Sequence, residues 1–191
     1  MPDDDARVRI QEALRGREPV LWAGQPDPAL RWRRGDAACT AMGVVFCGFI
    51  SFWLTTALRA GAPWFFAVFG CVFAAVGLWL LVGRWFHRAA RARRTYYGLT
   101  AGRAVVVVGH SVTEHSFPVA SSTVRRSRDG RHVDILFGPE SVAGRGLVIG
   151  GNTGAEWLLR ATYTNAFYDV TDVDAVLSAL DRIRRPAGTA G

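Results

Sequence analysis

Two long uncharged stretches dominate the first half of the chain. Residues 37–58 and residues 62–83 each contain 22 consecutive residues without a charged side chain, and only Arg59, Ala60 and Gly61 separate them. Each stretch exceeds the roughly 18 apolar residues that mark a membrane helix, and at about 1.5 Å per residue each can cross the roughly 30 Å core of a bilayer. The pattern therefore predicts an antiparallel hairpin of two transmembrane helices within residues 37–86.

The alternative is a buried hairpin in a soluble protein, but 191 residues are too few to cover two helices that are apolar on every side. Small residues recur along both stretches and favour close packing of the two helices. In the first stretch they are Cys39, Gly43, Cys47, Gly48, Ser51 and Thr55, and in the second Ala67, Gly70, Cys71, Ala74, Ala75 and Gly77. None of the cysteines has a C-x-x-C neighbour, so we interpret them as small apolar residues rather than metal ligands.

Beyond residue 95 the pattern changes to short apolar runs separated by turn residues. The predicted strands cover residues 96–100, 103–109, 112–118, 122–126, 132–137, 147–149, 157–161 and 166–170. Many short strands of this spacing predict a small antiparallel sandwich or barrel. A helix follows as far as Arg184, because Val173, Val176 and Leu180 recur at amphipathic spacing after a capping sequence. Residues 95–185 are therefore predicted to form one α+β domain.

The N-terminal segment, residues 1–36, is mixed. The acidic residues 3–5 can cap a short helix that runs to about Arg15 and carries Ala6, Ile10, Ala13 and Leu14 on one side. Residues 18–28 then predict a short strand and a proline-bracketed turn, in which Trp22 is expected to pack against another part of the chain. The segment has no early apolar run, so we expect no cleavable signal peptide.

Charge is distributed unevenly. The chain has 23 basic and 16 acidic residues, a net charge of +7, and every basic residue is an arginine. Residues 37–94 contain six arginines and no acidic residue, and five of the six follow the second span while only Arg59 lies in the connecting turn. The positive-inside rule therefore places both termini in the cytoplasm. Because the excess charge lies beside the spans, we expect a membrane and no nucleic acid as partner.

Two motifs flank the predicted hairpin. Before it stands Glu-x-x-Leu-Trp-x-Gly-x-Pro, with Glu18 and Trp22, and after it Tyr-x-Leu-Thr-x-x-Arg, with Tyr97, Thr100 and Arg103. Together with the two spans and the final strand and helix from Phe167, the chain resembles bacterial membrane proteins with pleckstrin-homology-like (PH-like) domains. The resemblance implies a barrel of about seven strands with a C-terminal helix, a bacterial plasma-membrane location, and a role in binding or assembly rather than catalysis. It also implies a structural role for the motif residues Trp22, Tyr97, Thr100 and Arg103.

Arginines near the predicted membrane surface are candidates for contact with anionic lipid headgroups, since each adds about 1 kcal/mol of attraction there. They are Arg88, Arg91, Arg93, Arg94, Arg125 and Arg126. The alternative is that the first four only enforce topology and that the last two are solvated.

Three weaker signals suggest enzyme chemistry. His110, Glu114 and His115 contain metal-binding groups, but positions 110 and 115 of a regular strand point to opposite faces. Glycines within residues 144–154 resemble a nucleotide loop, yet an apolar run follows the first pair and no lysine completes a P-loop. Residues 122–125 resemble a phosphate-gripping sequence, which needs two α/β domains. We therefore predict no catalytic residue, metal or cofactor.

The sequence thus predicts a non-enzymatic membrane protein that presents a PH-like domain to the cytoplasm for protein binding, lipid binding or self-assembly. An accessory subunit of a membrane enzyme or transporter is the alternative. A transporter needs charged or polar groups within its spans, and residues 37–58 and 62–83 offer only hydroxyls and thiols.

Overall fold

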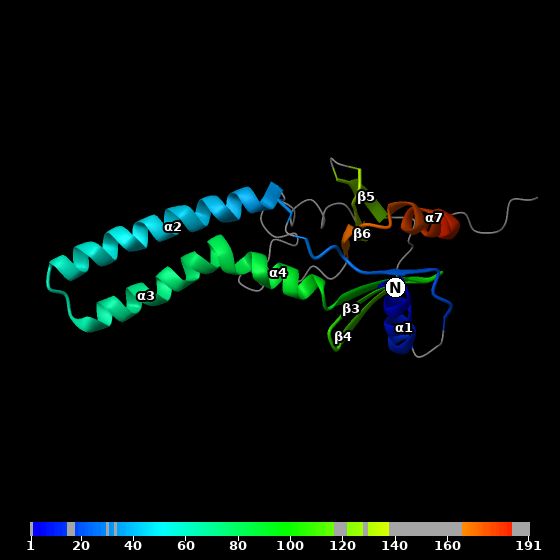
Figure 1. The fold of residues 1–191 in the computed structure, drawn as a ribbon, viewed down its shortest axis with the longest axis horizontal. Helices are drawn as coiled ribbons and strands as arrows, with labels where there is room; N and C mark the ends of the chain where they lie inside the picture. Colours follow the sequence, from blue (N-terminus) through cyan, green and yellow to red (C-terminus); the bar gives the residue numbers. More distant parts are fainter. Residues whose placement is uncertain are drawn as a thin grey trace, which may run out of the picture. The chain divides into compact units, whose positions relative to one another are not determined.

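The computed structural model describes residues 2–14, 18–29, 31–32, 34–116, 122–127, 130–137 and 166–184 (Figure 1). The chain forms two compact units. Of the described residues, those within 2–29, 89–137 and 166–184 form a β unit, and those within 31–88 form a helical unit. The helical unit is therefore inserted between two parts of the β unit.

The first sheet of the β unit has four antiparallel strands in the order β1-β2-β3-β4. They are β1 (Trp22–Gly24), β2 (Thr95–Leu99), β3 (Arg103–Val108) and β4 (Ser111–Ser116). Strand β1 precedes the helices and pairs directly with β2 after them, with Trp22 opposite Leu99 and Gly24 opposite Tyr97. The N-terminal segment is thus part of this sheet and does not stand apart from the predicted domain of residues 95–185.

Helix α1 (Pro2–Ala13) packs on one face of this sheet. Its buried Ala6 and Ile10 contact the cluster that contains Val105 and Val107, which confirms the predicted apolar side of this helix. Contact is closest at Gly98, where a Cβ atom would lie 2.4 Å from Cγ2 of Ile10. Glycine at this position therefore allows α1 to approach the strand.

The other face of the sheet shares a core with a second antiparallel sheet and the C-terminal helix. The second sheet has the order β5-β6-β7, with β5 (Ser122–Arg126), β6 (Val133–Phe137) and β7 (Ala166–Val170), and helix α7 spans Val173–Arg184. Ala104 and Val106 of β3 face this core while Val105 and Val107 face α1. Since both faces of β3 are buried, its sequence is continuously apolar rather than alternating.

The predicted closed barrel is wrong for the part of the chain that the structure describes, where the strands form two separate sheets. One isolated bridge, between Pro26 and Val170, joins the segment after β1 to β7. Proline has no N–H group to donate, so a ladder cannot continue through this position. The α+β class and the C-terminal helix are confirmed, with Val173, Val176 and Leu180 buried.

Six of the predicted strands are confirmed as β2 to β7, with shifts of at most one residue at the ends that the structure describes. The predicted strands at 147–149 and 157–161, and the end of the strand that was predicted to reach residue 118, lie outside the described residues. Arg15, the predicted end of the first helix, also lies outside the described residues, and α1 is observed as far as Ala13.

Two helices are long and apolar enough to cross a membrane, Asp36–Arg59 and Trp64–Ala92, and both belong to the helical unit as far as residue 88. The first lies within α2 (Arg34–Arg59), and the second consists of α3 (Trp64–Leu78), the π-helical turn η1 (Trp79–Gly83) and α4 (Arg84–Ala92). Helices α2 and α3 run side by side (Figure 1). Both helices extend past the predicted spans into charged sequence, because backbone hydrogen bonding continues there irrespective of side-chain charge.

Small residues bring the two helices together at fewer places than the sequence predicts. Added Cβ atoms at Gly43 and Gly77 would lie 2.8 Å from Leu81 and 2.5 Å from the Cys47 sulfur, so these predicted contacts are confirmed. Gly48 has open space around it. Four further small residues are also exposed: Ser51, Thr55, Cys71 and Ala75. They were predicted at the interface but fall on other faces, since each residue turns an α-helix by about 100°.

Replacing Gly98 with alanine tests the close approach of α1. We expect Gly98→Ala to weaken the packing of α1 by about 1–3 kcal/mol, because overpacking forces the neighbouring side chain to move. Amide hydrogen exchange of α1 in the detergent-solubilised protein should accelerate by roughly 5- to 150-fold. Gly102→Ala is the control, since nothing lies within 4 Å of its added Cβ. Equal exchange in the two variants would contradict the proposed contact.

Candidate functional site

Two clusters of charged side chains join parts of the chain that are far apart in sequence. The sheet cluster belongs to the β unit and contains Glu18, Thr100, Arg103 and Glu114. The helix cluster belongs to the helical unit and contains Asp36, Thr40, Arg84 and Arg88. The sheet cluster connects Glu18, which precedes the first span, to residues that follow the second span. The helix cluster connects residues of α2 to residues of α4.

In the sheet cluster the two sequence motifs meet. The Arg103 guanidinium donates to Glu18 Oε1 and to Glu114 Oε2, both at 2.6 Å. The Thr100 hydroxyl donates to Glu18 Oε2 at 2.8 Å, and its oxygen accepts the backbone N–H of Arg103 at 3.1 Å. Glu18 of the first motif therefore binds both polar residues of the second motif.

Electrostatics favour the charged form of Arg103. The hydrogen bond that Arg103 donates to Glu114 and the negative charge of Glu18 raise the pKa of Arg103 above its ordinary value, in that order of importance. Its side chain is a third exposed, so solvent screens these ion pairs and weakens their contribution to stability. Thr100, in contrast, is fully buried, so its hydrogen bonds matter more for stability.

The remaining motif residues, Trp22 and Tyr97, are core residues. Their rings pack against Phe167, with centroids at 5.9 Å and 4.6 Å respectively. The indole N–H of Trp22 donates to Asp172 Oδ2 at 3.3 Å, and the Tyr97 hydroxyl accepts the backbone N–H of Tyr168 at 3.2 Å. The expected packing of Trp22 is therefore confirmed, and both residues connect the first sheet to β7 and the start of α7.

The helix cluster is almost completely buried. Arg84 and Asp36 have no exposed side-chain area and Arg88 has 5%. The Arg84 guanidinium donates to Asp36 Oδ1 and to the Thr40 hydroxyl, the latter at 2.8 Å, while Arg88 donates to Asp36 Oδ2 at 3.2 Å. Two arginines thus share one carboxylate, and removing one member of such a buried set costs about 3–5 kcal/mol.

Aromatic rings surround these arginines. Both guanidinium groups lie over the ring of Trp85, with Cζ at 4.5 Å for Arg84 and 4.8 Å for Arg88 from its centroid. Trp85 in turn stacks on Trp32, with ring centroids 5.6 Å apart. Cation–π contacts of desolvated arginines are worth about 2 kcal/mol, so the rings help to hold the positive charges.

The arginines predicted to contact lipid headgroups do not form one group. Arg88 is buried against Asp36, so the structure gives it a partner other than a headgroup. Arg93, Arg94 and Arg126 are exposed, and Arg91 and Arg125 are half-buried. Arg125 lies opposite Asp134 in the β5–β6 ladder.

The weaker chemical signals lead to no common site. Glu114 binds Arg103, and His110 lies in the turn before β4 while His115 lies within it. Among the residues that the structure describes, no three His, Cys, Asp or Glu side chains are placed to hold a metal ion. The glycines of residues 144–154 lie outside the described part, and Ser122 begins strand β5.

Comparison with known proteins gives no relative. No protein-family model, no curated protein and no solved structure matches this chain.

Sequence analysis missed the helix cluster although a signal for it was present. Asp36 immediately precedes one uncharged stretch and Arg84 immediately follows the other. In an antiparallel hairpin these two positions lie at the same end, so opposite charges there predict an ion pair. Treating both residues only as boundaries of the spans concealed this relation.

Replacing Thr100 with valine tests the sheet cluster. We expect Thr100→Val to lower the free energy of unfolding of the detergent-solubilised protein by about 1–2 kcal/mol, because a buried N–H and the Glu18 carboxylate lose their partner. Urea denaturation measures this change. Thr113→Val in the neighbouring strand β4 is the matched control, and an equal effect of both substitutions would mean that the cluster adds nothing.

Proposed function

We propose that this chain is a non-enzymatic integral membrane protein whose helical hairpin anchors a PH-like domain at the cytoplasmic face. The domain binds a protein partner or lipid headgroups, or joins copies of itself. The observation that carries the proposal is the pairing of β1 with β2. These strands lie before and after the two helices, and their hydrogen bonds keep both flanking segments on one side of any membrane that the helices cross.

The surface of the hairpin supports membrane insertion. Large apolar side chains point outward along both helices, including Val45 (69% exposed), Phe52 (71%) and Phe69 (56%). Soluble proteins rarely expose apolar patches larger than a few hundred Å². Such a surface is compatible with the apolar acyl chains of lipids.

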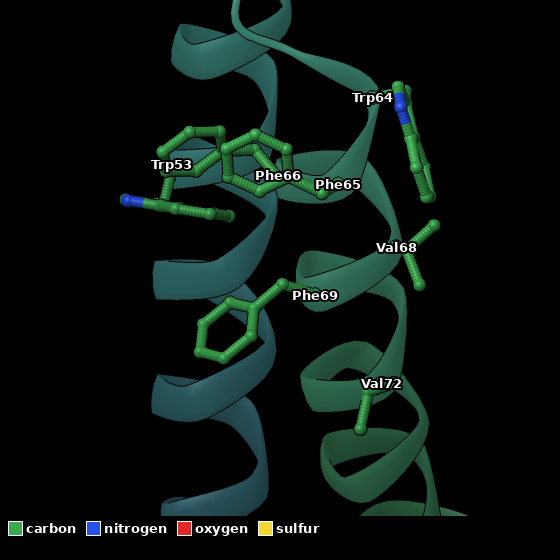
Figure 2. A pocket seen from close by; sticks show the side chains of 7 residues that line it. All are labelled: Trp53, Trp64, Phe65, Phe66, Val68, Phe69 and Val72. Carbon is green, nitrogen blue, oxygen red and sulfur yellow. The ribbon is translucent and has the colours of Figure 1, made fainter.

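The end of the hairpin near the connecting turn is rich in aromatic residues. An open hollow of about 600 Å³ lies there between apolar side chains of α2 and α3. Figure 2 shows Trp53 of α2 close to Phe66 and Phe69 of α3, whereas Trp64 points away from them. Trp64 is 78% exposed. Exposed tryptophan at the end of an apolar helix is typical of a membrane interface.

The arrangement of the β unit supports the PH-like interpretation. Its described strands form one sheet of four and one of three, followed by a C-terminal helix. Antiparallel sheets followed by a final helix are what the family resemblance implies. The sheet cluster adds support, because it joins the residues on which the resemblance depends.

Headgroup contact remains part of the proposal for Arg93 and Arg94. Both are exposed and follow directly on α4. Arg126 is exposed on β5 and offers a second contact. The transporter alternative gains little from the helix cluster, because its charges lie at one end of the helices and bind one another, whereas transport sites lie near the middle of the bilayer.

Fractionation of cells that produce the full chain with a C-terminal fluorescent protein tests the anchor. We expect fluorescence on the cytoplasmic side and retention of the protein in membranes after carbonate washing. Phe49→Arg should reduce retention, since arginine at a helix centre costs about 2.5–3.5 kcal/mol of insertion free energy, whereas Phe49→Leu should not. Release of the parent protein by carbonate, or a reporter outside the cytoplasm, would contradict the anchor.

Photo-crosslinking in native membranes tests the binding role. A benzophenone amino acid at position 93 or 126 should form adducts that mass spectrometry identifies as lipid, a second copy or another protein. The control places the same amino acid at Glu12, which is exposed on α1. The binding proposal fails if positions 93 and 126 give no more adduct than position 12.

A further inference from the structure

The second long helix changes its winding immediately before the helix cluster. Residues Trp79–Gly83 form the π-helical turn η1, and the backbone N–H of Arg84 bonds to the carbonyl of Trp79, five residues earlier. A π turn accommodates one residue more than an α turn would. Such turns are rare and occur often at functional sites.

Side chains bind two carbonyl groups within this turn. Nε of Arg84 donates to the Leu80 carbonyl at 2.7 Å, and the indole N–H of Trp85 donates to the Leu81 carbonyl at 3.1 Å. In an α-helix these carbonyls would accept the backbone N–H groups of the same two residues, four positions later. The side chains of Arg84 and Trp85 therefore stabilise the π form.

Helix α2 holds the Arg84 side chain in this position. Its guanidinium is completely buried and bonded to the Asp36 carboxylate, the Asp36 carbonyl at 3.3 Å and the Thr40 hydroxyl. If the Asp36 carboxylate no longer contacts Arg84, the arginine loses its counter-ion, and keeping its guanidinium buried costs free energy. The Arg84 guanidinium can then reach water only if its side chain turns away from α2.

We propose that η1 is a register switch which the Asp36–Arg84 ion pair holds in its π form. When the pair is broken, η1 relaxes to an α-helix. Because one residue corresponds to about 100° of rotation and 1.5 Å of rise, the residues after the turn rotate by about 100° relative to α3. Arg84 is thus a positioning residue that sets the rotation of α4.

The last residues of α4, 89–92, belong to the β unit, and hydrogen bonds connect residues 91–94 to its first sheet. The Thr95 hydroxyl donates to the Arg91 carbonyl at 2.8 Å, and the backbone N–H of Gly109 donates to the Arg94 carbonyl at 2.8 Å. Strand β2 begins three residues after the last residue of α4. The switch therefore goes beyond the proposed function, and it does not depend on what the β unit binds.

Distances between spin labels in the full-length protein in nanodiscs test the switch. One label pair joins Ala38 of α2 to Phe86 of α4, and a reference pair joins Val45 of α2 to Val72 of α3. All four positions are exposed, and Cys39, Cys47 and Cys71 are replaced by alanine. Asp36→Ala should change the first distance by on the order of 4 Å, the displacement of a Cα atom in such a rotation, and leave the reference distance unchanged.

Two further variants separate the switch from loss of structure. Arg84→Met breaks the pair and leaves Asp36 bonded to Arg88, so it should change the first distance in the same direction as Asp36→Ala but by less. Deletion of Val82 removes the extra residue of the π turn, so α4 keeps its orientation at the end of a continuous α-helix. When Arg84→Met is added to this deletion variant, neither distance should change from its value in the deletion variant. Arg59→Gln, which removes an exposed charge at the opposite end of α2, is the control and should leave both distances unchanged.

The switch is refuted if Asp36→Ala and Arg84→Met leave the first distance unchanged. It is equally refuted if they shift the reference pair as well, because the helices have then separated instead of rotating. A shift caused by Arg84→Met in the deletion variant would also overturn it, since that variant has no π turn to relax.

Discussion

The hydrogen bonds between β1 and β2 constrain the rest of the chain. Gly24 and Tyr97 lie opposite each other in one sheet although more than 70 residues separate them. The intervening chain must therefore leave the sheet and return to a neighbouring strand. Each long helix carries the chain away from the sheet or back to it, so an even number of helices meets this requirement. Two antiparallel helices are the smallest set that does so. The same constraint underlies the proposed topology, because it holds both ends of the hairpin to one domain.

Charged residues reinforce this arrangement in both units, and the physical setting differs between them. In the sheet cluster Arg103 lies between two carboxylates in partly exposed surroundings, where Coulomb attraction is screened and the buried Thr100 hydroxyl is the more important group. In the helix cluster two arginines share Asp36 without exposure to solvent. Loss of one partner there is costly, which is why a local change of helical winding can depend on one ion pair.

Much of the architecture follows from the linear pattern. Uncharged length predicts two long helices, and short apolar runs separated by turn residues predict β2 to β7. The apolar spacing of Ile10 and of Val176 predicts which sides of α1 and α7 are buried. These properties are local, since each depends on residues within about one or two turns of helix or one strand. The motif residues Trp22, Thr100 and Arg103 also stand out in the sequence, although pattern alone does not reveal that Glu18 binds the last two.

The sequence by itself determined the type and approximate extent of the elements, because hydrophobic periodicity and the distribution of charge are local. Only the tertiary structure decided that β1 joins the sheet of β2, that the described strands form two sheets rather than a closed barrel, and that Arg88 binds Asp36 instead of a lipid headgroup. It also decided which small residues lie between the helices, since Gly43 and Gly48 differ only in the direction they face. These outcomes depend on contacts between distant segments, and their geometry exists only after the chain has folded.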